Sequence, residues 1–204
     1  TGLREFSIKR KAALRELLTE GSRATSVEEA GNVLARAICD AVGTRHAVVL
    51  LRGEAEEIGA VAIVGVHPVY HEAIRAELIG QPLERFPLWR AFDTDTSPAF
   101  IEDATLSSLL PADLVRRMRL RSYVALPLAV GGGLLGLVVC TRGGPTTWNE
   151  ADRELVAQLA LEGSLVVENA SLRWAERNRM FELAHKAFHD ALTGLPNRTL
   201  FVDR

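Results

Sequence analysis

The sequence is poor in cysteine and lacks any long apolar run. Its two cysteines, Cys39 and Cys140, stand far apart, each among apolar residues. This pattern is typical of reduced, buried thiols in a cytosolic protein, since nothing else in the sequence indicates secretion. No apolar stretch approaches the roughly 20 residues that a membrane-spanning helix needs. Residues 1–14 are charged and amphipathic, unlike a signal peptide. We therefore expect a cytoplasmic protein without a membrane span.

Strong charge of either sign is also missing. The 24 lysines and arginines nearly balance the 26 aspartates and glutamates, which leaves a net charge of −2. A nucleic-acid-binding domain usually carries a basic excess, so we expect no nucleic-acid partner. A chain of 204 residues has room for one full domain with appendages, but not for two complete domains.

Histidines form two pairs with a spacing of four, and neither pair predicts a metal site. The proline after His67 keeps that residue out of a helix, so its ring need not share a face with His71. No cysteine or third histidine lies near them. His185 and His189 are interpreted as solvated or dimer-facing. His46 is a weak candidate for a haem ligand, and we expect no metal and no cofactor.

The hydrophobic pattern predicts an alternation of helices and short strands around a central antiparallel sheet. An S-x-x-E pattern from Ser26 to Glu29 predicts a capped helix start, and Gly21 is expected to end the helix before it. The fold class is therefore α+β, with helices from both chain ends on one face and an irregular segment on the other. The expected elements are helices over 3–19 and 26–43, strands over 46–51 and 58–66, a short helix from residue 68, a strand within 99–104, a short helix over 111–120, and a hairpin of strands 123–130 and 134–140.

A long helix is predicted from Glu150 to Phe188, capped by Thr147 or Asn149. Its length is typical of a coiled coil. A stripe of apolar residues with alternating spacings of three and four, broken at Arg177, predicts a parallel homodimer. A helix that packs only on its own domain is the alternative. The predicted dimer residues are Val167, Ala170, Trp174, Phe181, Ala184 and Phe188.

Residues 122–172 resemble the C-terminal half of GAF domains. They contain a strand ending in Pro-Leu, a glycine turn, a strand that begins L-x-G, and a helix start of the type hydrophobic-Asn-Glu. The helix closes with E-N-A-x-L at Glu168–Leu172. The resemblance, extended by the upstream order of elements, implies a helix over 1–25, a sensory GAF domain over 26–170 and a linker helix over 171–188.

The last stretch, HDALTGLPNRTLFVDR, resembles the opening of GGDEF diguanylate cyclase domains, which reads D-x-L-T-G-L-x-N-R. The resemblance implies that residues 189–204 begin a truncated GGDEF domain in a cyclic-di-GMP signalling protein. The GGDEF loop is not in the sequence, so the chain is expected to have no catalytic residues and not to be an enzyme as given. The matching residues are Asp190, Leu192, Thr193, Gly194, Leu195, Asn197 and Arg198.

The irregular middle segment corresponds to the part of GAF domains that covers a ligand pocket. Aromatic residues alternate there with charged ones, as a small-molecule site requires. The alternative is that the aromatics are ordinary core. The pocket candidates are Phe86, Trp89, Arg90, Phe92, Phe100, Asp103, Met118 and Arg119.

Three functions remain open from the sequence. The first is a ligand-sensing regulatory domain whose dimeric helix controls an attached diguanylate cyclase. The second is a ligand-free structural dimerisation module, and the third a haem or redox sensor. The region TTWNEADRE lacks the lysine of the N-K-x-F-D-E signature found in cyclic-nucleotide-binding GAF domains. The sequence does not identify the effector, the direction of control, or whether a phosphodiesterase domain follows.

Overall fold

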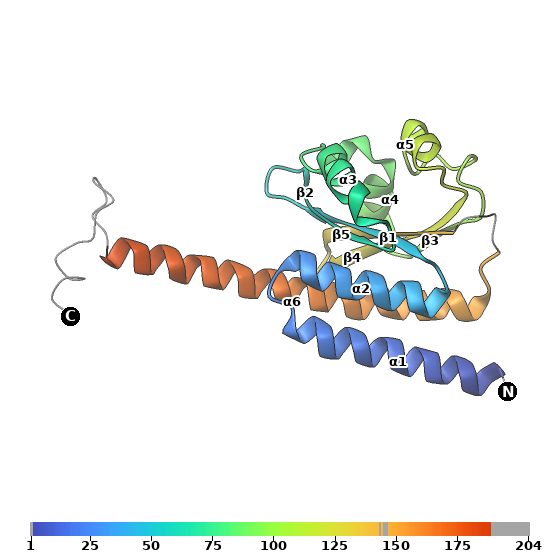
Figure 1. Ribbon diagram of the computed structural model, residues 1–204, viewed down its shortest axis with the longest axis horizontal. Coiled ribbons are helices and arrows are strands. Elements are labelled where there is room, and N and C mark those ends of the chain that lie inside the picture. Colours follow the sequence, from blue (N-terminus) through green and yellow to red (C-terminus); the bar gives the residue numbers. More distant parts are fainter. Residues whose placement is uncertain (1, 143, 145–146, 189–204) are drawn as a thin grey trace.

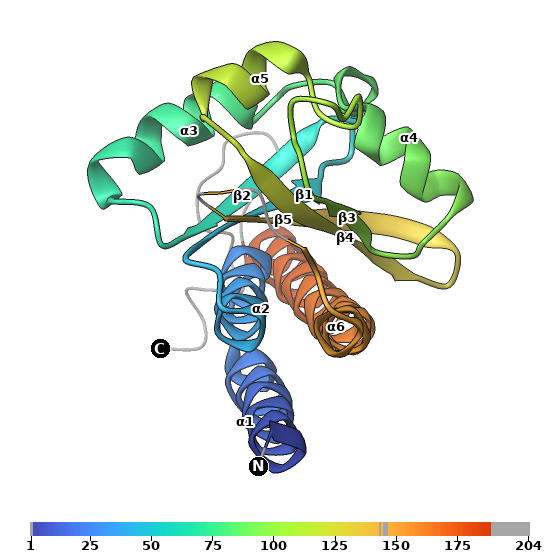
Figure 2. The same cartoon turned by 90° about the vertical axis from the view of Figure 1, so that its right-hand side faces the viewer.

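The computed structural model describes residues 2–142, 144 and 147–188. A five-stranded antiparallel sheet separates a layer of three long helices from a layer of short helices and turns (Figure 1). The end-on view in Figure 2 shows α2 and α6 against one face of the twisted sheet, with α1 packed on their outer side, and the short helices on the opposite face. The predicted α+β class, with helices from both chain ends on one face, is confirmed.

The sheet has the strand order β2-β1-β5-β4-β3, and all neighbours are antiparallel. The hairpin of β4 and β5 turns through Gly131 and Gly132, which have φ values of 59° and 83°. A two-residue hairpin loop needs such positive φ angles, and glycine adopts them without strain. The strands are β1 (His46–Arg52), β2 (Ile58–Val64), β3 (Ala99–Ile101), β4 (Ser122–Val130) and β5 (Gly133–Arg142).

The long-helix layer consists of α1 (Gly2–Arg23), α2 (Val27–Val42) and α6 (Glu150–Phe188). The predicted cap of α2 is confirmed, because the Glu29 backbone N–H donates to Ser26 Oγ over 3.1 Å. The expectation that Gly21 ends α1 was wrong. A Cβ atom at Gly21 would lie 2.5 Å from Val166 Cγ1, so glycine here allows a close helix crossing rather than a helix end.

The opposite face carries α3 (His71–Leu78), α4 (Pro87–Thr94) and α5 (Ala112–Arg117), with 3₁₀ turns at Pro68–Tyr70 and Leu83–Arg85. The sequence did not predict α4. Pro87 suits the first helical position, and Leu88, Trp89 and Phe92 give the helix one buried face.

Two hydrophobic clusters fill the two sides of the sheet, because successive strand residues point to opposite faces. Along β5, Val138 and Cys140 join the cluster under the long helices, whereas Leu137 and Val139 join the cluster under the short ones. None of the helices in the described part of the chain combines the length and apolar character needed to cross a bilayer.

Candidate functional site

Three of the predicted pocket residues meet on the face of the sheet under the short helices. Phe86, Trp89 and Phe92 are each at most 4% exposed and belong to one apolar cluster with Leu137 and Val139 of β5. The α4 helix places Trp89 and Phe92 on its inner side. In this structure the three aromatic rings therefore serve as core.

The same cluster contains two buried polar groups, of which one has a hydrogen-bond partner among the described residues and the other has none. The Trp89 Nε1–H is buried and has no hydrogen-bond acceptor among the described residues. The Tyr123 hydroxyl lies 3.0 Å from Ser107 Oγ, and burial raises the pKa of Tyr123. Neither Tyr123 nor Ser107 was predicted from the sequence as a site residue. The alternation along β4 was the available signal for Tyr123, because it places this residue on the same face as Ala125.

Ion pairs join the short helices above this cluster. Arg117 at the end of α5 pairs with Glu77 of α3 and, over 3.2 Å, with Asp113. Arg85 reaches the same Asp113 carboxylate over 3.5 Å. These side chains are 33% to 54% exposed, so each pair contributes little to stability. Their position nevertheless ties α3, α5 and the Leu83–Arg85 turn together over the sheet.

The depression under these ion pairs is closed. It is lined by Leu78, Phe86, Pro111 and Leu114, with charged residues at its rim, and its cavity volume for a water-sized molecule is about 0 Å³. The predicted small-molecule pocket is thus not open here. A ligand on this face would have to separate α3 from α5.

The other five pocket candidates lie elsewhere. Phe100 of β3 points to the long-helix face, because the neighbouring Ala99 and Ile101 occupy the short-helix face. Arg90 is exposed. Met118 is 37% exposed and follows α5. The other two candidates, Asp103 and Arg119, form turns.

These two turns have local roles. The Thr105 hydroxyl donates to Asp103 Oδ1 over 2.6 Å, and this bond and the Thr105 backbone N–H hold the pKa of Asp103 below its usual value. Arg119 adopts the left-handed backbone (φ 51°) that closes α5, and Leu120 N–H then donates back to the Val115 carbonyl.

Phe100 links the edge of the sheet to the start of α6. Its ring packs edge-on against Trp148, with 5.7 Å between centroids. The Arg153 guanidinium of α6 lies 4.5 Å from the Phe100 ring centroid, and Arg142 of β5 covers Trp148 at the same distance. Strand β3 places side chains on both faces of the sheet, and through Phe100 it contacts the first turn of α6.

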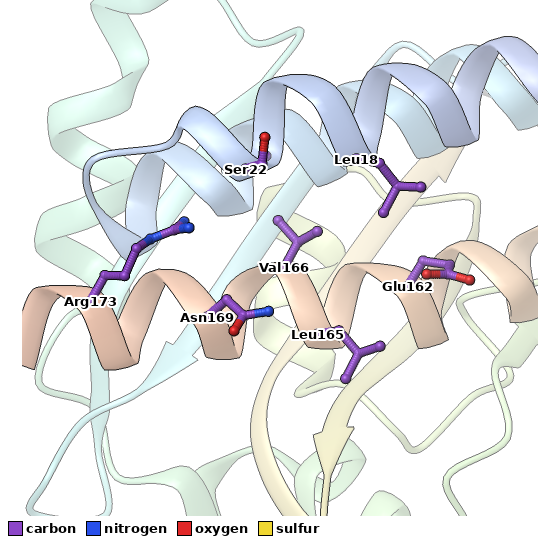
Figure 3. A pocket seen from close by; sticks show the side chains of 8 residues that line it. Leu18, Ser22, Glu162, Leu165, Val166, Asn169 and Arg173 are labelled. Carbon is purple, nitrogen blue, oxygen red and sulfur yellow. The ribbon is translucent and has the colours of Figure 1, made fainter.

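A groove on the other side of the molecule is lined by α1 and α6, which pack against each other (Figure 3). Its volume is about 260 Å³. Leu18 points from α1 toward α6, and Val166 points back toward α1, while Arg173 extends along the side of the groove. The Arg173 Nη2 atom is buried without a hydrogen-bond partner in the described structure.

The predicted dimer stripe on α6 is only partly free. Val167 and Ala170 are 1% and 2% exposed and belong to the chain's own core, so their assignment to a dimer contact was wrong. Farther along, Trp174 is 50% and Phe181 74% exposed. Ala184 is also exposed and Phe188 is half-buried. Arg177 Nη1 approaches the Thr25 carbonyl at 3.5 Å, which marks the end of the contact with the turn between α1 and α2.

A second apolar stripe on α6 is exposed along the body of the domain. Leu161, Leu165 and Leu172 are 44% to 64% exposed. At 100° per residue these three side chains fall within about 40° of one another, roughly opposite the buried Ala170. The exposed and the buried stripe both have helical spacing, so the sequence alone does not distinguish them.

The histidines of the domain have local contacts. His67 Nδ1 accepts from the Val69 backbone N–H over 3.3 Å, and His71 Nε2 lies 2.8 Å from the Val66 carbonyl. His46 is exposed at the start of β1. Across residues 2–142, 144 and 147–188, no three histidine, cysteine or acidic side chains are grouped closely enough to hold a metal ion. The GGDEF-like motif from Asp190 to Arg198 lies outside the described residues.

The five-stranded antiparallel sheet, with short helices on one face and long helices on the other, defines the class of protein as a layered α+β domain. The family model "GAF domain" matches residues 26–167. The chain therefore belongs to the GAF domain family. GAF domains are typically sensory or regulatory domains of signalling proteins and are not catalytic.

Solved structures support the fold. A GAF domain of a phosphoenolpyruvate-protein phosphotransferase from Coxiella burnetii has a TM-score of 0.65 at 16% identity, with 82% of this chain and 98% of that chain covered. A GAF/HD domain protein from Geobacter sulfurreducens has a TM-score of 0.62 at 21% identity, with coverages of 72% and 95%. At such identities the similarity shows the fold alone. None of the curated protein sequences matches this chain.

Proposed function

We propose that this chain is the sensory domain of a cyclic-di-GMP signalling protein and controls an attached diguanylate cyclase through a dimeric α6 helix. The observation that carries this proposal is the continuity of α6. One helix of 39 residues begins against the sheet at Glu150 and continues past Arg177, which contacts the α1–α2 turn, to Phe188. The GGDEF-like sequence from Asp190 onward follows it directly.

The effector site that we propose lies between the sheet and the short helices, below the Arg117–Glu77 ion pair. An unsatisfied buried N–H costs about 1–3 kcal/mol, so an acceptor on a ligand would stabilise the Trp89 indole. The exposed ion pairs of Arg117 are weak enough for α5 to move away from α3. An aromatic or planar molecule with a hydrogen-bond acceptor fits this apolar setting best.

The test compares wild type with Trp89→Phe in a thermal-shift screen of nucleotides and metabolites. Phenylalanine removes Nε1 and keeps an aromatic ring. A ligand at a hundred times its Kd adds about 2.7 kcal/mol of stability, and we expect the variant to lose most of that shift. Without ligand, we expect the melting temperature of Trp89→Phe to fall only by the amount that its smaller buried ring area explains. If no compound stabilises wild type, the effector part of the proposal fails.

The route from this site to α6 runs through β3 in our proposal. Ala99 and Ile101 contact the short-helix side, while Phe100 between them contacts Trp148 and Arg153. A displacement of the short helices would shift β3 and thereby the start of α6. Phe100→Leu keeps an apolar side chain but removes the ring that Arg153 covers. We expect this variant to bind an effector normally and to transmit its effect poorly.

The output is tested by joining residues 1–188 in frame to a GGDEF catalytic domain and measuring the conversion of GTP to cyclic-di-GMP. Inserting one residue after Arg177 turns the distal helix by about 100°, whereas inserting seven restores nearly the same orientation. We expect the single insertion to change the rate and the seven-residue insertion to preserve it. Equal rates in all three proteins would contradict control through α6.

A ligand-free dimerisation module is the second candidate, and the closed cavity of about 0 Å³ favours it. Such a module would retain the dimer and the dependence on helix phase. It would show no ligand-induced change of melting temperature. The thermal screen therefore separates the two functions.

A further inference from the structure

The two cysteines, 101 positions apart in sequence, meet between α2 and the sheet. Cys39 lies in the last turn of α2, and its carbonyl accepts from the backbone N–H groups of Gly43 and Thr44. Cys140 lies in β5, paired with Ala47 on one side and Val124 on the other. Both side chains belong to the cluster under the long helices.

A second contact fixes the same helix turn over the same strand. Arg142 is two residues after Cys140, so both side chains leave β5 on the same face. The Arg142 guanidinium donates to the Val42 carbonyl, one turn of α2 after Cys39. The end of α2 is thus held against β5 independently of the thiols.

The thiols also differ in their surroundings. Cys140 is fully buried, whereas Cys39 keeps 5% of its surface exposed. The neighbouring Cys140 side chain lowers the pKa of Cys39. The interaction with Cys39 and complete burial raise the pKa of Cys140. Cys39 is consequently the better nucleophile and the more accessible one.

We propose that Cys39 and Cys140 form a reversible thiol–disulfide switch that responds to hydrogen peroxide. The Cys39 thiolate attacks one peroxide oxygen, the O–O bond breaks, and Cys39 sulfenic acid and hydroxide form. The Cys140 sulfur then attacks the Cys39 sulfur, the S–O bond breaks, and water leaves as the S–S bond forms. In sum, two thiols give two electrons and two protons to one peroxide, which becomes two water molecules.

The disulfide would fix the end of α2 to the centre of the sheet. A disulfide holds its two sulfur atoms about 2.05 Å apart, so its formation must bring the last turn of α2 closer to β5. Because α2 packs along α6, this movement reaches the long-helix layer. The switch goes beyond the proposed function and requires neither the effector nor the cyclase.

The experiment treats the reduced, folded chain with hydrogen peroxide, blocks the remaining thiols in acid denaturant and measures intact mass. We expect a loss of about 2 Da that a dithiol reverses, with a Cys39–Cys140 peptide pair in the digest. Glutathione disulfide should react far more slowly, because it is too large to reach Cys39. Two free thiols after peroxide treatment, or a disulfide only between chains, would overturn the proposal.

Two variants assign the roles of the cysteines. Cys140→Ala should stop at the sulfenic acid on Cys39, which dimedone traps. Cys39→Ala should leave Cys140 unreacted while the chain is folded. Oxidised wild type should melt higher than reduced wild type by about 5 °C or more, because the bridge restricts the unfolded chain. The same treatment should leave the melting temperature of each variant unchanged. An equal rise in the variants would contradict a bridge between these two residues.

Discussion

Glu29 stabilises the turn before α2 by accepting hydrogen bonds from two donors of Thr25. The backbone N–H and the hydroxyl of Thr25 donate to Glu29 Oε2 over 2.6 and 2.8 Å. The backbone bond and then the hydroxyl lower the pKa of Glu29 below its ordinary value of 4.5. The turn between α1 and α2 therefore depends on an ionised carboxylate.

This carboxylate predicts a dependence of stability on pH. A lowered pKa in the folded chain gives stability above the unfolded value, and that stability is lost as pH falls through the folded value. Wild type should melt above Glu29→Gln at pH 7, and the two melting temperatures should converge below pH 4.5. Thermal melts from pH 7 to pH 3.5 measure the difference. A constant difference at every pH would contradict the role of the charge.

Arg119 affects the stability of the chain mainly through its backbone conformation. Its φ of 51° costs about 1–2 kcal/mol for a residue with a Cβ atom, and glycine adds about 0.5–1 kcal/mol of unfolded-state entropy. Arg119→Gly should therefore stabilise the chain by about 0.5 kcal/mol in urea unfolding. The matched control is Arg116→Gly, inside α5, which should destabilise by up to about 1 kcal/mol. Destabilisation by both would show that the Arg119 side chain matters more than its backbone.

At the level of elements, glycines set the distances between the long helices. A Cβ atom at Gly163 of α6 would lie 2.3 Å from Leu34 Cδ1, and Leu34 is fully buried. A Cβ atom at Gly31 of α2 would meet Ala62 and Val49 at an ordinary 3.4 Å. The same substitution should thus have opposite effects at the two sites.

Gly163→Ala should destabilise the chain by about 1–3 kcal/mol through overpacking. Gly31→Ala should be neutral or stabilise it by up to about 1 kcal/mol, because alanine favours the helix. Chemical unfolding of both variants against wild type measures the two changes. A loss of stability in Gly31→Ala as large as that in Gly163→Ala would contradict the close contact as the cause.

The elements also show where sequence reasoning succeeded and failed. The cap at Ser26, a glycine turn beginning at Gly131 and the start of α6 at Glu150 follow from local rules, and the structure confirms them. The face of the sheet or helix on which a residue is buried depends on partners that are distant in sequence. The sequence predicts Phe100 in the pocket, but a strand of three residues is too short for the alternation of its side chains to show which face Phe100 occupies. Gly21 was taken as a helix end, whereas it allows Val166 to approach.

For the whole molecule, the exposed leucines of α6 predict where two chains meet. The stripe of Leu161, Leu165 and Leu172 lies beside the groove that Leu18 of α1 also lines. The buried Val167 is on the other side of the helix, so a partner cannot use it. In the dimer that we propose, we expect the two chains to meet through these leucines along the body of the domain.

The double variant Leu165→Glu/Leu172→Glu should dissociate at least tenfold more readily than wild type, because four carboxylates would face one another across the dimer. Light scattering after size-exclusion chromatography measures the mass at several concentrations. Val69→Glu is the matched control, since Val69 is 69% exposed in the 3₁₀ turn on the opposite side of the sheet. Dissociation by Trp174→Glu/Phe181→Glu alone would place the interface in the distal stripe instead.

The uninterrupted course of α6 also has a mechanical meaning. Its last 18 residues beyond the buried Ala170 span about 27 Å at 1.5 Å per residue, so a tilt of about 5° at the sheet moves the far end sideways by about 2 Å. In the proposed route of control, the helix would act as a lever whose short arm contacts Phe100 and Trp148. A rearrangement too small to open the sheet becomes, at Phe188, a displacement comparable to the width of an atom.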